Sequence, residues 1–153
     1  MPSLADILKA EADLASAFVI VLEEEQEVLK TGNPDALPSL AERKSTLAGQ
    51  LNPQSAARNR LLASEGLPGD RPGIEGWLSK HPKDGAVRQE WNRLLEVTRR
   101  AHELNRVNGE LIRLRQQHNS EALDALLPGL RQDLYSPEGQ TAPVTGRRII
   151  DSA

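Results

Sequence analysis

Three histidines, His81, His102 and His118, are the residues best suited by type to metal binding or acid–base chemistry. Two histidines of one helix can share a metal when they are about three or four residues apart, because both rings then lie on the same face. His102 and His118 are sixteen residues apart. This spacing argues against a metal centre, and we expect neither a metal nor a cofactor.

The remaining chemically suggestive residues do not converge either. Glu23, Glu24 and Glu25 point in successive directions around a helix, so we expect a solvated acidic face there. The glycines from Gly66 to Gly73 follow no predicted strand and lack the Lys-Ser/Thr of a phosphate-binding loop. Ser3, Ser39 and Ser45 have no matching histidine and acid at a convergent spacing, and the Glu-x-x-His pattern of ferritin-like sites is absent. We therefore do not expect an enzyme.

The composition favours a single helical domain of 153 residues. Aromatic residues make up 3% of the chain, so a core must consist of Leu, Ala, Val and Ile, which suit helix-on-helix packing. Cysteine is absent, and a net charge of -3 gives nucleic acid no general attraction. No apolar run approaches the roughly 20 residues of a spanning helix, and no signal peptide is recognisable. We expect a cytoplasmic protein.

Apolar residues recur every seven positions between Leu4 and Leu29 and predict a long amphipathic helix that ends before Gly32 and Pro34. A second helix is expected from Leu37 towards Gly66, with either a kink or a break at Pro53. The columns of the first helix are Ile7, Leu14, Val21, Val28 and Leu8, Ala15, Leu22, Leu29.

Residues 66–85 read as a long connection with one helical turn near Trp77 and Leu78, and Trp77 and Trp91 are expected as core or cover residues. A third helix is expected from near Asp84. Its apolar positions alternate spacings of three and four, which indicates coiled-coil-like packing. We therefore predict an all-α fold: an elongated antiparallel three-helix bundle, or coiled-coil-like hairpin, with a long third helix and a mobile C-terminal tail. The seam residues are Leu94, Val97, Ala101, Leu104, Asn108, Leu111 and Arg115.

The third helix should be longer than its neighbours. A helix from Asp84 to Leu127 would measure about 65 Å, against about 40 Å for the first helix. We expect its end to overhang and to present a leucine cluster to a partner, with residues 1–127 forming the bundle and 128–153 a flexible tail. Alternatively, the chain folds back at Pro128-Gly129 and covers the cluster itself. The cluster consists of Leu123, Leu126, Leu127, Leu130 and Leu134.

Two asparagines and the charge distribution bear on how the helices pair. Asn108 falls on the seam with Asn105 beside it, where a buried amide would fix register or partner choice; an exposed edge position is the alternative. The first thirty residues carry a net charge of -5 and residues 86–115 one of +3. We expect the first and third helices to attract each other along their flanks, although each exposed pair contributes only a few tenths of a kcal/mol.

The order of several short motifs along the chain resembles the FlgN family. The resemblance covers nearly the whole chain, and its most specific element is the tyrosine and glycine after the long helix. The motifs are Leu22-Glu23-Glu24-Glu25, Leu40 to Lys44-Ser45-Thr46-Leu47, Arg58 with Leu61-Leu62 and Gly66, Asn105 with Asn108-Gly109, and Tyr135-Ser136-Pro137-Glu138-Gly139-Gln140.

This resemblance implies a type III export chaperone that binds the C-terminal helical segments of the hook-filament junction proteins FlgK and FlgL. It implies delivery of the loaded complex to the export gate protein FlhA, with Tyr135 as a docking contact. The leucine cluster would then bind the client, and the free protein would be a monomer or weak dimer. The alternative function is a structural coiled-coil adaptor that forms homo-oligomers through the same seam.

Overall fold

The computed structural model describes residues 1–126, and every regular element in that range is helical. This confirms the predicted all-α fold. None of the described helices is both long and apolar enough to cross a membrane. The chain divides into two compact units, Met1–Leu111 and Ile112–Ala153. The elements are α1 (Leu4–Thr31), η1 (Pro34–Ala36), α2 (Leu37–Ser64), α3 (Arg71–Lys80) and α4 (Gly85–Leu126).

Both ends of α1 are set by local sequence. Ser3 Oγ accepts a hydrogen bond from the Asp6 amide at 3.1 Å, and Asp6 Oδ2 accepts one from the Ser3 amide at 3.1 Å. This reciprocal capping box satisfies two amide donors at the start of the helix. At the other end Gly32 adopts a left-handed conformation with φ of 81°, and its amide donates to the Val28 carbonyl at 3.1 Å. The helix therefore ends where the Gly32-Pro34 pattern predicted.

The second helix, α2, continues through Pro53 as one element of 28 residues. A proline has no amide hydrogen and crowds the carbonyl four residues earlier, which here belongs to Gly49. Gly49 and Pro53 are both exposed, so water can reach the backbone carbonyl that lacks its helical partner. Of the kink and the break that the sequence left open, the break does not occur.

The connection predicted for residues 66–85 contains a ten-residue helix, α3, rather than a single turn. Its core face is formed by Ile74 and Leu78, which are 0% and 6% exposed. Gly73 is required because a Cβ there would lie 1.6 Å from the Pro68 carbonyl oxygen. The glycines and prolines that suggested a loop thus serve helix entry and close packing, and the expectation of a single turn was wrong for this reason.

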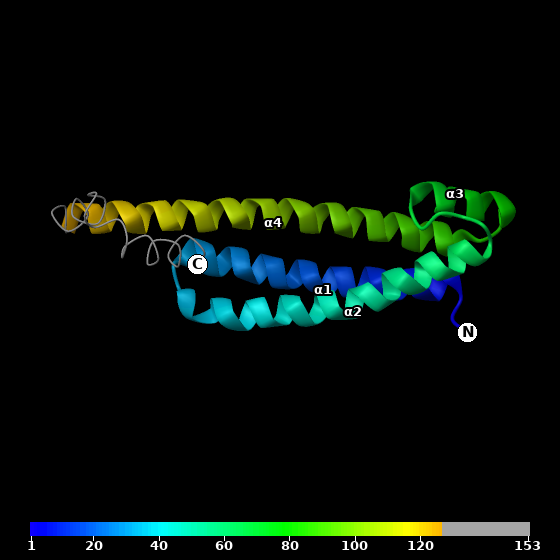
Figure 1. Ribbon diagram of the computed structural model, residues 1–153, viewed down its shortest axis with the longest axis horizontal. Helices are drawn as coiled ribbons and strands as arrows, with labels where there is room; N and C mark the ends of the chain where they lie inside the picture. The colour runs from blue at the N-terminus through cyan, green and yellow to red at the C-terminus, as the bar shows by residue number, and fades with distance from the viewer. Residues whose placement is uncertain (127–153) are drawn as a thin grey trace, which may run out of the picture. The chain divides into compact units, whose positions relative to one another are not determined.

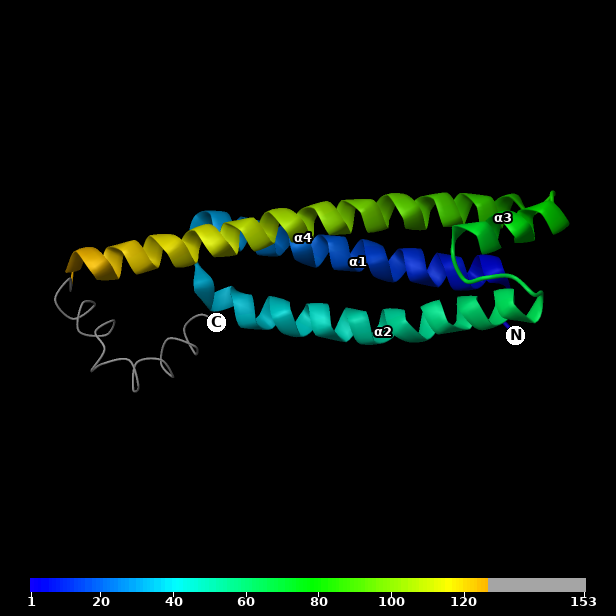
Figure 2. The same cartoon turned by 45° about the horizontal axis from the view of Figure 1, so that its top comes forward.

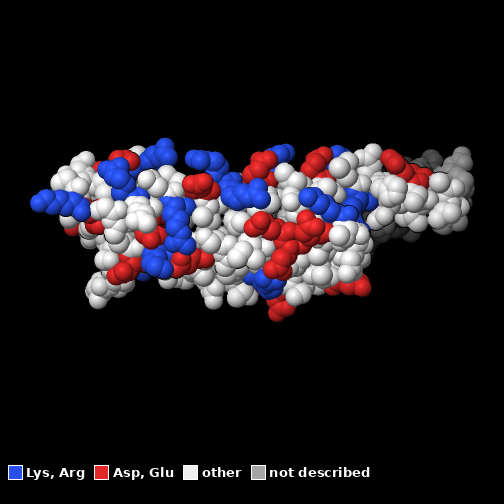
Figure 3. Space-filling view, turned by 180° about the vertical axis from the view of Figure 1, so that it is seen from behind, with Lys and Arg blue, Asp and Glu red and all other residues white. Residues whose placement is uncertain are grey.

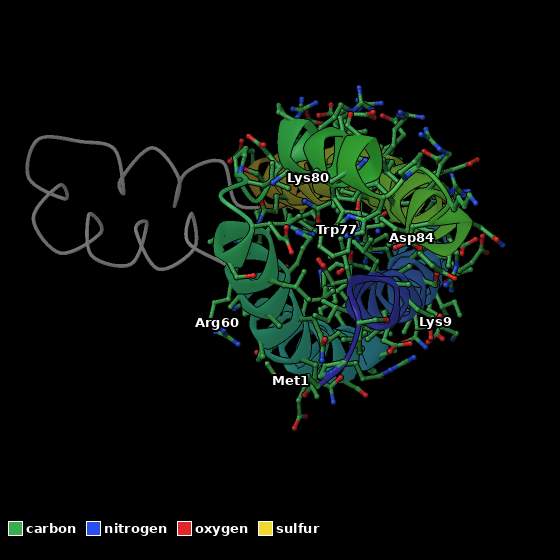
Figure 4. All side chains as sticks on the ribbon, turned by 90° about the vertical axis from the view of Figure 1, so that its right-hand side faces the viewer. Met1, Lys9, Arg60, Trp77, Lys80 and Asp84 are labelled. Atoms are coloured by element: carbon green, nitrogen blue, oxygen red, sulfur yellow. The ribbon has the colours of Figure 1, made fainter. Side chains whose placement is uncertain are left out.

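Trp77 joins the end of α3 to the start of α4. Its ring stacks on His81 with centroids 4.0 Å apart, and its Nε1 donates to Asp84 Oδ2 at 3.2 Å. Asp84 also accepts from the Val87 amide at 3.3 Å, which caps the first turn of α4. Figure 4 shows Trp77 towards the centre of the end view, with Arg60 and Lys9 at its edge. Trp77 is half-buried and Trp91 is buried, as expected of core or cover residues.

Within the first unit, α1, α2 and α4 lie side by side, and α2 runs antiparallel to the other two (Figures 1 and 2). The main apolar core of the first unit lies at the end where α3 meets the other helices. Residues from all four α-helices contribute to this core. The core consists of Leu4, Leu8, Ala12, Ala15, Leu62, Ile74, Leu78, Val87, Trp91 and Leu94.

Replacing Leu62 with Ala should destabilise the protein far more than the same change at Leu51 of the same helix. Leu62 is 0% exposed within this core, whereas Leu51 is only partly buried. We expect a loss of about 3 kcal/mol for Leu62→Ala and about 1 kcal/mol for Leu51→Ala, measured by urea denaturation. Equal losses would show that the core is not concentrated at the α3 end.

Candidate functional site

Two acidic residues of α1 are buried and paired with basic residues of α2. Glu11 is 3% exposed, and its Oε2 lies 2.6 Å from Arg58 Nη1 and accepts from Ser55 Oγ at 3.0 Å. Glu25 is 6% exposed, and its Oε2 lies 2.7 Å from Lys44 Nζ. Each pair links α1 to α2 inside the first unit.

The burial of Glu25 corrects the expectation of a solvated acidic face for the whole run. Glu23 and Glu24 are exposed as expected, but Glu25 is not. It lies three residues after Leu22, which places it on the face of α1 that packs against the other helices. A heptad column of alternating type could have revealed this, because Leu4, Glu11, Phe18 and Glu25 follow one another at intervals of seven.

The two pairs specify one alignment of α1 on α2. Glu11 and Glu25 are fourteen residues apart, and so are Lys44 and Arg58, so both pairs form in the same antiparallel register. A slip of one heptad would set Glu25 level with Leu37 or Leu51 and leave a buried carboxylate without its base. An unpaired buried charge is strongly destabilising, and a slip of one heptad would separate both Glu11 and Glu25 from their bases.

Asn108 of α4 completes the polar layer around Glu25. The residue is 1% exposed, and its Nδ2 donates to the Leu22 carbonyl and to Glu25 Oε1, each at 2.9 Å. The structure therefore places Asn108 inside the bundle rather than at an exposed edge. Asn105 is exposed. Of the two asparagines singled out from the sequence, only Asn108 contacts α1 through these bonds.

The environment of Glu11 disfavours its ionised form. Burial raises the pKa of the Glu11 carboxyl, and this effect outweighs the attraction of Arg58 and the hydrogen bonds from Ser55 and Arg58. Its Oε1 is buried without a hydrogen-bond partner among residues 1–126. The Arg58 guanidinium in turn lies 5.7 Å from the centroid of the Trp91 ring, so the Glu11–Arg58 pair is also connected to α4.

Ion pairs also connect the flanks of α1 and α4, as the charge distribution predicted. Arg93 Nη2 lies 2.5 Å from Asp13 Oδ1, and Arg100 Nη2 lies 3.9 Å from Glu23 Oε2. Hydrogen bonds from Lys9 and Arg93 hold the pKa of Asp13 below its ordinary value. Figure 3 shows acidic and basic side chains interspersed over one face of the protein. These pairs are exposed and contribute little individually.

The described end of α4 presents apolar side chains to solvent. No residue of α4 between Gly109 and Leu126 is buried, and Leu114, Leu123 and Leu126 are 47%, 57% and 75% exposed. Leu123 and Leu126 belong to the cluster singled out from the sequence, and both are exposed. The other residues of that set, Leu127, Leu130, Leu134 and Tyr135, lie outside the described residues.

The histidines do not assemble into a reactive centre in the described range. His81 stacks on Trp77, while His102 and His118 are exposed on α4. Residues 1–126 contain no group of three or more His, Cys, Asp or Glu side chains arranged to hold a metal ion. The arrangement offers exposed apolar side chains on a helix rather than a converging set of reactive groups, which suits binding.

Comparison with known proteins identifies the family. The family model described as FlgN protein matches residues 1–143, which is most of the chain. The chain belongs to the FlgN family. The resemblance found in the sequence is thereby confirmed. The described part of this FlgN chain contains both α1 with its two buried acids and the exposed leucines of α4.

Several curated FlgN relatives named Flagella synthesis protein FlgN match over almost their full length. The protein of Salmonella typhimurium strain LT2 is 26% identical over 144 residues, which cover 93% of this chain and 92% of the relative. The protein of Yersinia enterocolitica is 27% identical over 146 residues, and that of Escherichia coli K12 is 25% identical over 144, with the same coverage. No solved structure matches this FlgN chain.

Replacing Glu11 with Gln should change how stability depends on pH. Because the folded state raises the Glu11 pKa, the contribution of this carboxyl is complete below its unfolded pKa and declines as the pH rises through its folded pKa. The unfolding free energy of the native protein, relative to Glu11→Gln, should therefore increase as the pH falls from about 7 to about 4. Chemical denaturation at several pH values measures this difference.

Glu24 provides the matched contrast, since a hydrogen bond from Arg43 lowers its pKa. Its contribution is present above the unfolded pKa and is lost as the pH falls through the folded pKa. The native protein relative to Glu24→Gln should thus lose stability over the same range, by a small amount because both side chains are exposed. A slope of the same sign for Glu11 and Glu24 would contradict the burial effect at Glu11.

Exchanging the charges of Glu25 and Lys44 tests whether this pair fixes the alignment of α1 on α2. Each single variant, Glu25→Lys or Lys44→Glu, places two like charges in a buried layer and should cost more than about 1 kcal/mol. The double variant restores an opposite pair, so the coupling energy should lie between about 0.5 and 3 kcal/mol. Additive losses in thermal or urea unfolding would show that the two side chains do not act together.

Proposed function

We propose that this protein takes part in flagellum assembly as a cytoplasmic export chaperone. In this role it binds the C-terminal helical segments of the junction proteins FlgK and FlgL, prevents their premature assembly and delivers them to the export gate protein FlhA. Membership of the FlgN family and the relatives named Flagella synthesis protein support the flagellar role. The observation that carries the chaperone role is the exposed apolar end of α4.

The exposed leucines are arranged for helix recognition. Leu123 and Leu126 are three residues apart and share one face of α4, so they can act as neighbouring anchors for an amphipathic client helix. Burying each leucine against a client stabilises the complex by roughly 1.5–3 kcal/mol. Leu127, Leu130 and Leu134 also bind the client in this proposal. The client's polymerising surface is then covered until export.

Three further residues have roles in the proposal. Tyr135 contacts the export gate, since it follows the client-binding leucines and matches the terminal tyrosine of the family pattern. Asn108 fixes the register of α4 on α1, because its amide bonds to Leu22 and Glu25 form at only one alignment. Asn105, which is exposed, is then available to a partner. No energy source is needed for release if the affinity is moderate.

Replacing both Leu123 and Leu126 with Asp should abolish or strongly weaken client binding. Two lost apolar anchors correspond to about a hundredfold or greater loss of affinity for the C-terminal segment of FlgK or FlgL. Leu114→Ser is the matched control, because Leu114 is 47% exposed on the same helix but lies on the opposite face from Leu123. Size-exclusion chromatography with light scattering detects the complexes, and circular dichroism checks the fold.

The outcome separates the chaperone from the structural adaptor. Deleting residues 128–153 should also abolish client binding while the helicity and cooperative melting of the remaining bundle stay nearly unchanged. If the native protein forms no complex with either segment and instead assembles into a large homo-oligomer, the adaptor function replaces this proposal. If the deletion collapses the bundle, the leucine cluster belongs to the core.

A further inference from the structure

A groove of about 490 Å³ lies between α1 and α2 in the first unit. Ala17, Ile20 and Val21 line it from α1, and Leu47 contributes from α2. Ile20 is 55% exposed there, which is unusual for a large aliphatic residue on a helix whose other apolar positions are mostly covered. The groove therefore has an accessible apolar floor.

This groove faces away from α4. The Leu22 carbonyl and Glu25 receive the hydrogen bonds from Asn108, so this side of α1 is turned towards α4. Ile20 precedes Leu22 by two residues, which is about 200° around the helix. The α4 helix consequently covers the opposite side of α1 and leaves Ile20 open.

The rim of the groove is acidic. Glu24 and Glu27 follow Ile20 at spacings of four and seven and so share its face of α1, while Glu42 lines the groove from α2. Arg43 also lines the groove from α2, and it pairs with Glu24 at 2.5 Å, so these two charges cancel. Glu27 and Glu42 make no ion pair with any residue in the described part of the chain, so the rim keeps a net negative charge.

We propose that the groove between α1 and α2 is a second docking surface, which receives an aliphatic side chain from a basic amphipathic helix of a partner protein. Two antiparallel helices offer a groove into which a third helix packs at about 8–10 Å, and the apolar floor takes its anchor residue. The acidic rim selects basic side chains beside that anchor and penalises acidic ones. This surface is distinct from the proposed client site, because it lies on α1 and α2 and selects its partner by charge.

A defined peptide pair tests the docking surface on the full chain. The probe is a synthetic amphipathic helix of about 18 residues, or five turns, with leucines on one face and lysines on the other. Its counterpart carries glutamate in place of lysine. In methyl NMR spectra of isotope-labelled protein, the lysine peptide should shift the Ile20 signal and leave that of buried Ile74 unchanged, with affinity falling as salt rises. The glutamate peptide should not shift Ile20.

Matched variants decide whether the groove is the site. Ile20→Ser should weaken binding of the lysine peptide about tenfold, because it removes most of one buried aliphatic side chain. Glu42→Lys should weaken it severalfold through charge repulsion. The controls are Leu114→Ser, with similar exposure outside the groove, and Glu96→Lys, an exposed acid of α4; both should bind as the native protein does.

Three results would overturn the proposal. The first is unchanged affinity in Ile20→Ser, and the second is an equal loss in Leu114→Ser; either would place the peptide elsewhere. The third is an Ile20 signal that shifts with protein concentration before peptide is added, which would make a second copy of the chain the occupant. The double variant Leu123→Asp and Leu126→Asp should bind the lysine peptide normally, so failure of the client site remains distinguishable.

Discussion

The pairing of two buried acids on α1 with two bases on α2 is the constraint on which the rest of the first unit depends. Glu11 with Arg58 and Glu25 with Lys44 form in a single antiparallel register, and apolar residues lie between them along both helices. Leucine-rich faces alone tolerate slips of one heptad, because each slip exchanges one apolar contact for another. Buried charges do not tolerate them, since a slipped acid would lack its base. The buried pairs thus specify the helix register, but burying Glu11 disfavours its ionised form and raises its pKa.

This alignment of α1 and α2 determines how α4 can pack. At the α3 end, Val87, Trp91 and Leu94 enter the apolar core, and Trp91 also faces the Arg58 guanidinium. Further along α4, Asn108 binds the same carboxylate that Lys44 neutralises. The contacts of α4 thus change from apolar to polar along its length, and beyond Asn108 no described residue of α4 is buried.

The two proposed surfaces follow from where α4 packs on α1 and where it does not. A helix whose first part is fixed by core and hydrogen bonds can present leucines near its end without endangering the fold, because those side chains contribute little to the bundle. The groove on α1 and α2 is likewise left open because α4 packs on the other side of α1. The proposed sequestration of a client requires a stable bundle and exposed apolar anchors, and residues 1–126 contain a buried core as well as exposed leucines.

The sequence by itself determined three of the four α-helices, α1, α2 and α4, and the opposite charges along the flanks of α1 and α4. Heptad spacing predicts the helices, and the Gly32-Pro34 pattern predicts where α1 ends. These features and the opposite charges of α1 and α4 can be read from the sequence without knowledge of the packing. It also predicted accessible leucines at Leu123 and Leu126. Only the tertiary structure decided that Glu25 is buried, that α2 continues through Pro53 and that residues 71–80 form a helix. Glu25 is buried because Lys44 lies opposite it on α2. The helix α2 continues because Gly49 and Pro53 are exposed to water, and residues 71–80 form a helix because Gly73 can approach the Pro68 carbonyl closely. Each of these depends on the three-dimensional surroundings of a side chain or carbonyl, which the local sequence pattern does not contain.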